Sequence, residues 1–229
     1  MDNLLCRRPD GRTAAAIILA TEKLVAQYGA NGVSIRQIIF AAKVRNASAV
    51  QYHFGSRHGL FTAVYHHRIA GVDKRRLAEL RRLKREGRLG DCRAIVAVMV
   101  QALAEELKPR AEGNYYIRFI ERCVREYENQ PSDELARVHR IGLRIAGIHL
   151  ARILAYLPAE LVAMRLTECR SLGLYSLASM EADLERDPMT RVLLPLRIEM
   201  LIDGLAAALQ GPVSPSTVDA LKREVRHST

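Results

Sequence analysis

Residues 34–60 read SIRQIIFAAKVRNASAVQYHFGSRHGL. We expect a helix over residues 34–41, because Ser34 is a good N-cap and the isoleucines behind it recur at helical spacing. Ala42 is small enough for two helices to cross closely where this helix ends. The first part of the stretch therefore predicts a short helix and then a tight turn.

A second short helix follows the turn. Asn46 is an N-cap candidate and predicts a helix over residues 46–52. Gly55 breaks this helix, and Ser56 can cap the next one, which begins at Arg57. The arrangement is a helix-turn-helix, which places its second helix where the edges of DNA bases can be read.

The residues before and after this stretch extend the pattern. The first-helix region has a basic residue, an apolar stripe and a terminal glycine, and a Tyr-His-Phe-Gly-Ser-Arg block follows later. The residues that carry the pattern are Arg12, Ile17, Ala20, Leu24, Val25, Gly29, Ser34, Ile35, Ile38, Ala42, Val44, Tyr52, His53, Phe54, Gly55, Ser56, Arg57, Leu60 and Phe61. Over residues 10–65, approximately, the chain resembles the DNA-binding domain of the TetR family of bacterial transcription regulators.

Two positions depart from the family pattern. Lys43 stands in the helix–helix turn where the family usually has glycine, and His58 stands where it usually has glutamate. If the turn needs a positive φ, a lysine there costs about 1 kcal/mol. Lys43 is therefore the one feature that favours a loss of DNA binding.

Length and composition allow one large helical domain or two smaller ones, since 49% of the 229 residues are apolar. No apolar run approaches the roughly 20 residues that span a bilayer, and the first residues contain too short an apolar stretch for a secretory signal. The four cysteines form no CxxC pair, which favours a reducing compartment over a disulfide framework. We therefore expect a cytoplasmic protein with no membrane partner.

The net charge of +10 is concentrated in the first part of the chain. Residues 1–88 carry 17 Lys and Arg against 6 Asp and Glu, whereas residues 89–229 carry 18 against 19. This imbalance predicts a polyanionic partner at the helix-turn-helix end. The basic run that begins at Lys74, Arg75 and Arg76 is too far along its helix to reach the same DNA, so we interpret it as a solvated face.

The rest of the chain also predicts helices, without a strand pattern or an internal repeat. Helices are expected at about 12–28, 57–85, 91–107, 113–129, 133–156, 159–186, 190–209 and 215–226, with Pro195 in the first turn of its helix. The predicted fold is all-α. The resemblance implies an N-terminal three-helix DNA-binding domain over residues 1–58 and a C-terminal helical ligand-binding and dimerisation domain over residues 59–229.

Base-edge chemistry and the resemblance together select the DNA-contacting residues. Arg45 can pair bidentately with guanine, and Asn46 and Gln51 can do so with adenine. Ser48 can bind either a base or a phosphate, and Ala49 and Val50 are the expected packing positions. The expected phosphate contacts are Ser34, Arg36, Gln37, Tyr52, His53 and Arg57.

Four of these residues have a structural alternative. Ser34 and Asn46 can serve only as helix caps. Gln37 can be a solvated helix position, and Tyr52 can pack half its ring into the small domain.

A small-molecule pocket is implied within the second domain, lined by apolar residues and a few polar ones. The expected ligand-binding residues are Met99, Tyr116, Phe119, Cys123, Arg144 and Ile148. Arg144 either meets an anionic ligand or pairs with an acid such as Glu121. For the other residues, the alternative is plain core packing.

The helices expected over 159–186 and 190–209 carry more apolar surface than one bundle seam requires. We interpret the excess as a two-fold, four-helix dimer interface, with ordinary intrachain core as the alternative. The expected interface residues are Leu161, Met164, Leu172, Tyr175, Met200, Leu201, Gly204, Leu205 and Ala208.

Catalytic and metal-binding patterns are absent from the sequence, which contains no HExxH, GxSxG, P-loop or dinucleotide fingerprint. No carboxylate or cysteine cluster completes a metal site around His58, His66 and His67. We expect a ligand-responsive regulator, not an enzyme, with no cofactor, binding a palindromic operator as a homodimer, most simply as a repressor. An activator of the same fold, or a small-molecule-binding protein that has lost DNA binding, is the alternative.

Overall fold

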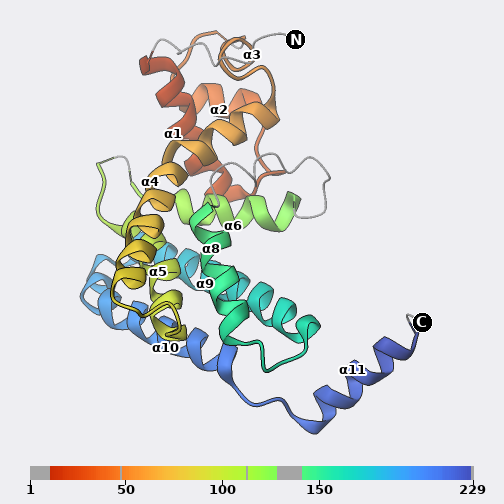
Figure 1. Ribbon diagram of the computed structural model, residues 1–229. Coiled ribbons are helices and arrows are strands. Elements are labelled where there is room, and N and C mark those ends of the chain that lie inside the picture. Colours follow the sequence, from red (N-terminus) through yellow and green to blue (C-terminus); the bar gives the residue numbers. More distant parts are fainter. Residues whose placement is uncertain (1–10, 47, 112, 128–140, 228–229) are drawn as a thin grey trace.

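The computed structural model describes residues 11–46, 48–111, 113–127 and 141–227. All regular structure in these ranges is helical (Figure 1), as predicted. The helices are α1 (Gly11–Tyr28), α2 (Ile35–Ala41), α3 (Ala49–Phe54), α4 (Arg57–Arg85), α5 (Cys92–Ala104), α6 (Tyr116–Tyr127), α8 (Ile141–Ile153), α9 (Ala159–Arg186), α10 (Leu194–Gln210) and α11 (Pro215–His227). Two 3-10 helices are η1 (Glu105–Leu107) and η2 (Pro188–Leu193).

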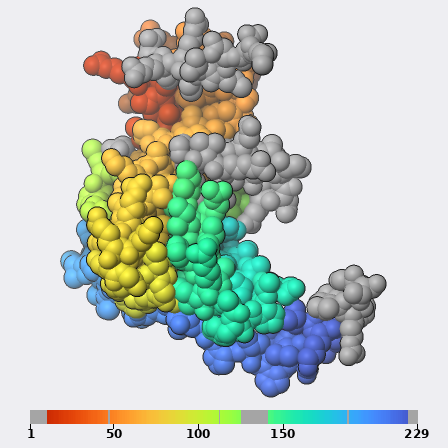
Figure 2. Space-filling model, viewed as in Figure 1, coloured from red at the N-terminus to blue at the C-terminus, as the bar shows by residue number. Residues whose placement is uncertain are grey.

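The helices form a small lobe and a larger bundle (Figure 1). α1, α2 and α3 pack around the first turns of α4, which then continues into the bundle of α5, α6, α8, α9 and α10. α1 also packs against α6, so the lobe rests on the bundle through two helices. Figure 2 shows α4 and α8 side by side on one face, below the lobe. The predicted division between residues 58 and 59 falls in the first turn of α4 and stays a prediction.

The turn after α2 forms a complete C-terminal cap. Lys43 N–H donates to the Phe40 carbonyl at 3.0 Å, and Val44 N–H donates to the Ile39 carbonyl at 3.1 Å. This is the Schellman pattern, which places the residue after the C-cap in the left-handed region. Lys43 has φ 55°, and among the described residues it alone has a positive φ without being glycine.

Replacing Lys43 with glycine is expected to raise the free energy of unfolding by about 1 kcal/mol, because glycine has no Cβ to strain at this φ. The end of α4 provides the reverse comparison, since Gly87 occupies the same cap position with φ 68°. Gly87→Ala should therefore lower stability by about 1 kcal/mol. Urea unfolding measures both, with Lys43→Ala as the control that removes the charge and keeps the strain. Equal stability of the glycine and alanine variants at position 43 would contradict the account.

Some predicted helix limits are corrected. α3 begins at Ala49, three residues later than predicted, and the residue before it is Ser48. Asn46 does not cap this helix, because its side-chain Oδ1 accepts a hydrogen bond from the Ser48 N–H at 2.9 Å in a local turn. Because Lys43 is left-handed and Asn46 lies in this turn, α3 begins further along the chain than predicted.

The later helices agree more closely with the sequence. The helix expected over 113–129 begins only at Tyr116, because Gly113 has φ 87°. α10 begins at Leu194 with Pro195 in its first turn, as predicted. Residues 133–140 of the helix expected over 133–156 lie outside the described residues.

Candidate functional site

α3 has one buried face and one exposed face. Ala49 and Val50 are buried against the lobe, as predicted. Ser48, Gln51 and Tyr52 are exposed, and 74% of Tyr52 is accessible. The short helix is thus held by apolar residues while polar side chains point outward.

Most of the predicted DNA-contacting residues lie at the surface of the lobe. His53 is half-buried, with its ring edge-on to Tyr52 at a centroid distance of 4.9 Å. The exposed residues are Ser34, Arg36, Gln37, Arg45, Asn46, Ser48, Gln51 and Tyr52. The structure therefore brings α2, the turn and α3 together as one polar surface.

Ser34 and Gln37 are already engaged in a capping box. Ser34 Oγ accepts from the Gln37 N–H at 3.3 Å, and Gln37 Oε1 accepts from the Ser34 N–H at 2.8 Å. The predicted N-cap role of Ser34 is thus confirmed, and phosphate contacts by Ser34 and Gln37 stay predictions.

Arg57 does not point to the surface as predicted. Its guanidinium donates to the Val33 carbonyl at 2.6 Å and to the Ala30 carbonyl, and it lies 5.0 Å from the centre of the Phe61 ring. Both carbonyls lie in the loop between α1 and α2, and a donor from α4 helps to satisfy them. In this structure Arg57 fastens the loop to α4, which corrects its assignment as a phosphate contact.

Two surface residues beside α3 were missed from the sequence. Phe40 is 87% exposed on α2, and Lys43 is exposed in the turn. Phe40 directly follows the buried Ile39 on α2. Because each residue turns a helix by about 100°, the side chain after a buried one points in a different direction, and this spacing could have predicted that Phe40 is exposed.

A second candidate site is a cavity of about 810 Å³ in the bundle. It lies among α4, α5, α6, α8, α9 and α10, and its walls are mainly apolar. Met99, Phe119 and Cys123 line it, as expected from the sequence. This volume is within the range of pockets that hold drug-sized ligands.

Three residues predicted for the pocket lie elsewhere. Tyr116 is buried outside the cavity lining, and its hydroxyl donates to the Tyr65 carbonyl at 2.8 Å. Arg144 and Ile148 are exposed on the outer face of α8. Leu150, on the opposite face of α8, is buried and lines the cavity instead.

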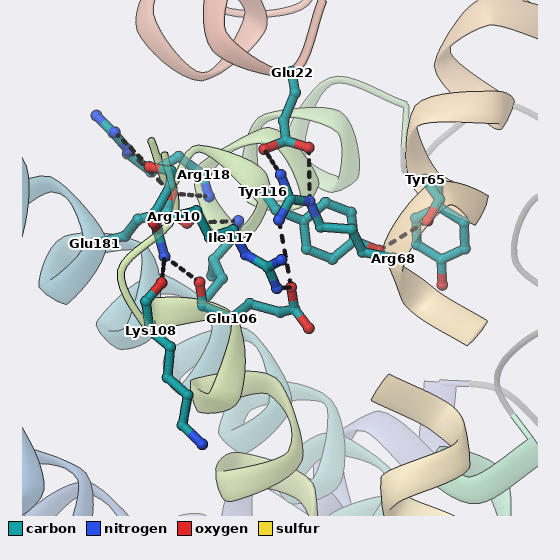
Figure 3. A network of polar contacts seen from close by, with 11 residues as sticks. Glu22, Tyr65, Arg68, Glu106, Lys108, Arg110, Tyr116, Ile117, Arg118 and Glu181 are labelled. Carbon is teal, nitrogen blue, oxygen red and sulfur yellow. Dashed lines mark hydrogen bonds and ion pairs between the residues drawn. The ribbon is translucent and has the colours of Figure 1, made fainter. Parts of the chain in front are cut away.

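A network of buried charges joins the lobe to the bundle (Figure 3). Arg68 of α4 donates two hydrogen bonds, each of 3.0 Å, to Glu22 of α1 and lies 3.7 Å from Glu106 of η1. Glu106 also accepts from Arg75 at 2.5 Å and Arg110 at 2.6 Å. The Arg75 contact corrects the interpretation of the basic run as a solvated face.

Glu181 of α9 forms a second node of the same region (Figure 3). Its carboxylate accepts from the backbone N–H groups of Ile117 and Arg118 at 3.0 and 2.9 Å, at the start of α6. Arg118 Nε adds a contact of 3.1 Å. Free N–H groups at a helix start favour a carboxylate, so Glu181 fixes the first turn of α6.

Stability should depend on pH through Glu22. Burial raises the pKa of the Glu22 carboxyl from 4.5 to about 7, against the opposing effect of the Arg68 charge. The folded state then binds more protons than the unfolded state, so the stability from this group is complete below pH 4.5 and is lost as pH rises through about 7. The loss should be roughly 3 kcal/mol.

The measurement is urea unfolding of the wild type and Glu22→Gln at pH 5, 6, 7 and 8. The wild type should lose stability relative to the variant, which has no carboxyl to titrate. Parallel pH profiles of the two proteins would refute the assignment.

The predicted dimer surface is mostly, but not entirely, exposed. Leu161 and Leu201 are half-buried, and the exposed residues are Met164, Leu172, Tyr175, Met200, Gly204 and Ala208. Leu205 is buried and lines the cavity, and its Cδ1 would lie only 3.2 Å from a Cβ on Gly173. Leu205 is therefore intrachain core, whereas the exposed residues stay a predicted interface.

Two other properties of the described residues limit the kinds of site. None of the described helices combines the length and apolar character that crossing a membrane requires. The described ranges contain no group of three His, Cys, Asp or Glu side chains placed to hold a metal ion.

Two solved structures resemble this chain. A transcriptional regulator from Rhodococcus sp. Rha1 matches 88% of this chain and 99% of its own, with a TM-score of 0.50 and 20% identity. A protein described as a TetR-family transcriptional regulator from Rhodococcus sp. matches 89% of this chain and 99% of its own, with a TM-score of 0.38 and 22% identity. Neither protein-family sequence models nor curated proteins gave a match. The first likeness shows the fold alone, and it agrees with the predicted all-α fold.

Proposed function

We propose that this protein is a dimeric transcription regulator that binds an inverted repeat in duplex DNA, most simply as a repressor. The observation that carries the proposal is α3, whose apolar residues are buried while Ser48, Gln51 and Tyr52 face solvent. A helix held in this way can enter the major groove with its polar side chains toward the bases. An activator would use the same contacts and differ only in where its operator lies.

Charge supports the same surface. Arg36, Lys43 and Arg45 are exposed on α2 and the turn, beside α3. Exposed cations that flank a reading helix are suited to phosphate contacts, which position the protein without selecting a sequence. Each phosphate neutralised this way makes DNA affinity fall more steeply with salt.

Base selection is assigned to Arg45, Ser48 and Gln51. A bidentate pair of arginine with guanine, or of glutamine with adenine, is worth about 1–3 kcal/mol of discrimination. Asn46 has part of its amide committed to the local turn, which weakens its case for base contact. Lys43 does not prevent the turn, because the full cap forms around it. This removes the feature that favoured a protein without DNA binding.

Ligand response would pass through α4, because this helix serves both sites. Phe61, Tyr65 and Ile69 line the cavity, and Arg68 binds Glu22 of the lobe. A ligand that binds better when α4 is displaced would shift the population toward a state with poorly spaced reading helices. A ligand with equal affinity for both states would change nothing.

The test is selection of bound sequences from random duplex DNA. The wild type should enrich an inverted repeat, and Gln51→Ala should relax one position in each half-site by about 10- to 100-fold in preference. Gln27→Ala, an exposed glutamine on α1, is the matched control and should keep the wild-type motif. A wild type that enriches no sequence refutes the proposal.

A further inference from the structure

Arg76 lies in the wall of the bundle cavity as a buried charge that forms no ion pair with the residues that the structure describes. It is on α4, only 6% exposed, and lines the cavity. Its Nε is fully buried with no hydrogen-bond partner, and no described carboxylate lies within 4.0 Å of its guanidinium. Arg68, eight residues earlier on the same helix, has two buried acids beside it.

Two acids lie three residues from Arg76 on α4, and both are already engaged. Glu79 pairs with Arg82 at 2.8 Å. Asp73, one turn earlier on α4, accepts a hydrogen bond from the Gly142 N–H at 2.9 Å and so holds the start of the described part of α8. Burial lowers the pKa of Arg76, and the charge of Asp73 opposes this only in part. A guanidinium stays protonated in proteins, so Arg76 remains a buried cation whose desolvation the charge of Asp73 offsets only in part.

The other cations of the cavity wall are not in this position. The Arg57 guanidinium is bonded to the Val33 and Ala30 carbonyls. Arg170 is exposed to solvent and therefore keeps part of its hydration. Among the lining arginines, Arg76 is thus the one whose desolvation a bound anion would compensate most.

Around Arg76 the cavity is built for an apolar body. Val96, Val100, Phe119 and Leu177 are buried in its wall. A volume of about 810 Å³ leaves room for a hydrocarbon chain or fused rings. A planar guanidinium pairs best with a carboxylate, through two parallel hydrogen bonds.

We infer that the effector is an amphipathic carboxylate, with an apolar aliphatic or aromatic body in the cavity and its carboxylate paired with Arg76. The inference rests on the proposed function only in calling this ligand an effector. The binding site itself follows from the buried cation, which has no ion pair among the described residues, and from the apolar walls around it.

The test compares two pairs of probes by calorimetric titration of the full-length protein. Each pair shares a body and differs in its head: decanoate with 1-decanol, and 2-naphthoate with 2-naphthalenemethanol. At least one carboxylate should bind ten times more tightly than its alcohol. Arg76→Met should weaken that carboxylate by about 30-fold or more and leave its alcohol unchanged.

Two further variants make the result specific. Arg76→Lys keeps a charge and should retain part of the carboxylate preference, whereas Lys74→Met removes an exposed charge from the same helix and should have no effect. Without ligand, Arg76→Met should raise the thermal midpoint, because it removes an uncompensated buried charge. A lower midpoint would mean that Arg76 is already paired and would overturn the inference.

Two other results would also overturn it: no preference of the wild type for either carboxylate, or unchanged carboxylate binding by Arg76→Met. DNA binding is measured separately on the same proteins. A wild type that binds duplex DNA but neither carboxylate refutes the ligand alone. One that binds a carboxylate through Arg76 but no duplex refutes the proposed function and leaves the ligand site standing.

Discussion

Replacing Arg68 with methionine should lower the free energy of unfolding by about 3–5 kcal/mol, because it leaves the buried Glu22 carboxylate without its cation. Arg68 holds Glu22 at 3.0 Å and lies 3.7 Å from Glu106, and all three side chains are almost fully buried. Methionine fills a similar volume, so lost packing adds little. Urea unfolding at pH 7.5 measures the change.

The control is Arg82→Met, which removes a cation from exposed pairs with Glu79 and Glu86 on the same helix. Exposed pairs of this kind contribute about 0–1 kcal/mol, so the control should stay close to the wild type. A double variant, Arg68→Met with Glu22→Gln, should recover part of the loss, since Glu22 is then no longer a buried charge without its cation, and Glu106 keeps Arg75 and Arg110. Equal stability of the two single variants would show that the buried network does not hold the lobe to the bundle.

Replacing Met200 with aspartate should dissociate the proposed dimer and weaken operator binding by about 10²- to 10⁴-fold. Met200 is 64% exposed on α10, and α9 exposes Met164, Leu172 and Tyr175. α9 and α10 pack against each other, and large apolar side chains left exposed on neighbouring helices are typical of a protein interface. A charge there would be buried without a partner in the dimer, and each monomer would then hold only one half-site.

Sedimentation gives the oligomeric state, and fluorescence anisotropy with the selected duplex gives the affinity. Ile148→Asp is the matched control, because Ile148 is exposed on α8, outside the predicted interface. It should remain dimeric with wild-type affinity. A monomeric wild type, or a Met200→Asp protein that is still a dimer, would contradict the interface.

Local signals predicted the helices of this chain well. The Ser34 cap, the isoleucine stripe and Pro195 each depend on neighbouring residues, and each lies where the sequence placed it. The predicted start of α3 was wrong because Lys43 is left-handed and the Asn46 side chain closes a local turn, so Asn46 does not act as the N-cap. Those two features depend on exact backbone angles, which composition does not reveal.

Site residues were harder to predict, because the faces of long helices are decided by partners far along the chain. Arg144 and Ile148 were predicted to bind a ligand inside the bundle, but they lie on the outer face of α8. The inner face of α8 meets α4 at Asp73 and Arg76. Leu205 belongs to a stripe that fits either an interface or a core, and Gly173 leaves the space that makes it core. Glu22 and Arg68 are 46 residues apart, so no local pattern joins them.

The central claim is that α3 reads base edges in the major groove. Methylation interference on the selected duplex tests it most directly, because dimethyl sulfate methylates guanine N7 in the major groove and adenine N3 in the minor groove. Guanine methylation in both half-sites should block binding of the wild type, and Arg45→Ala should lose sensitivity at one guanine in each half-site. Binding blocked only by adenine methylation, or unaffected by methylation at any position, would contradict the claim.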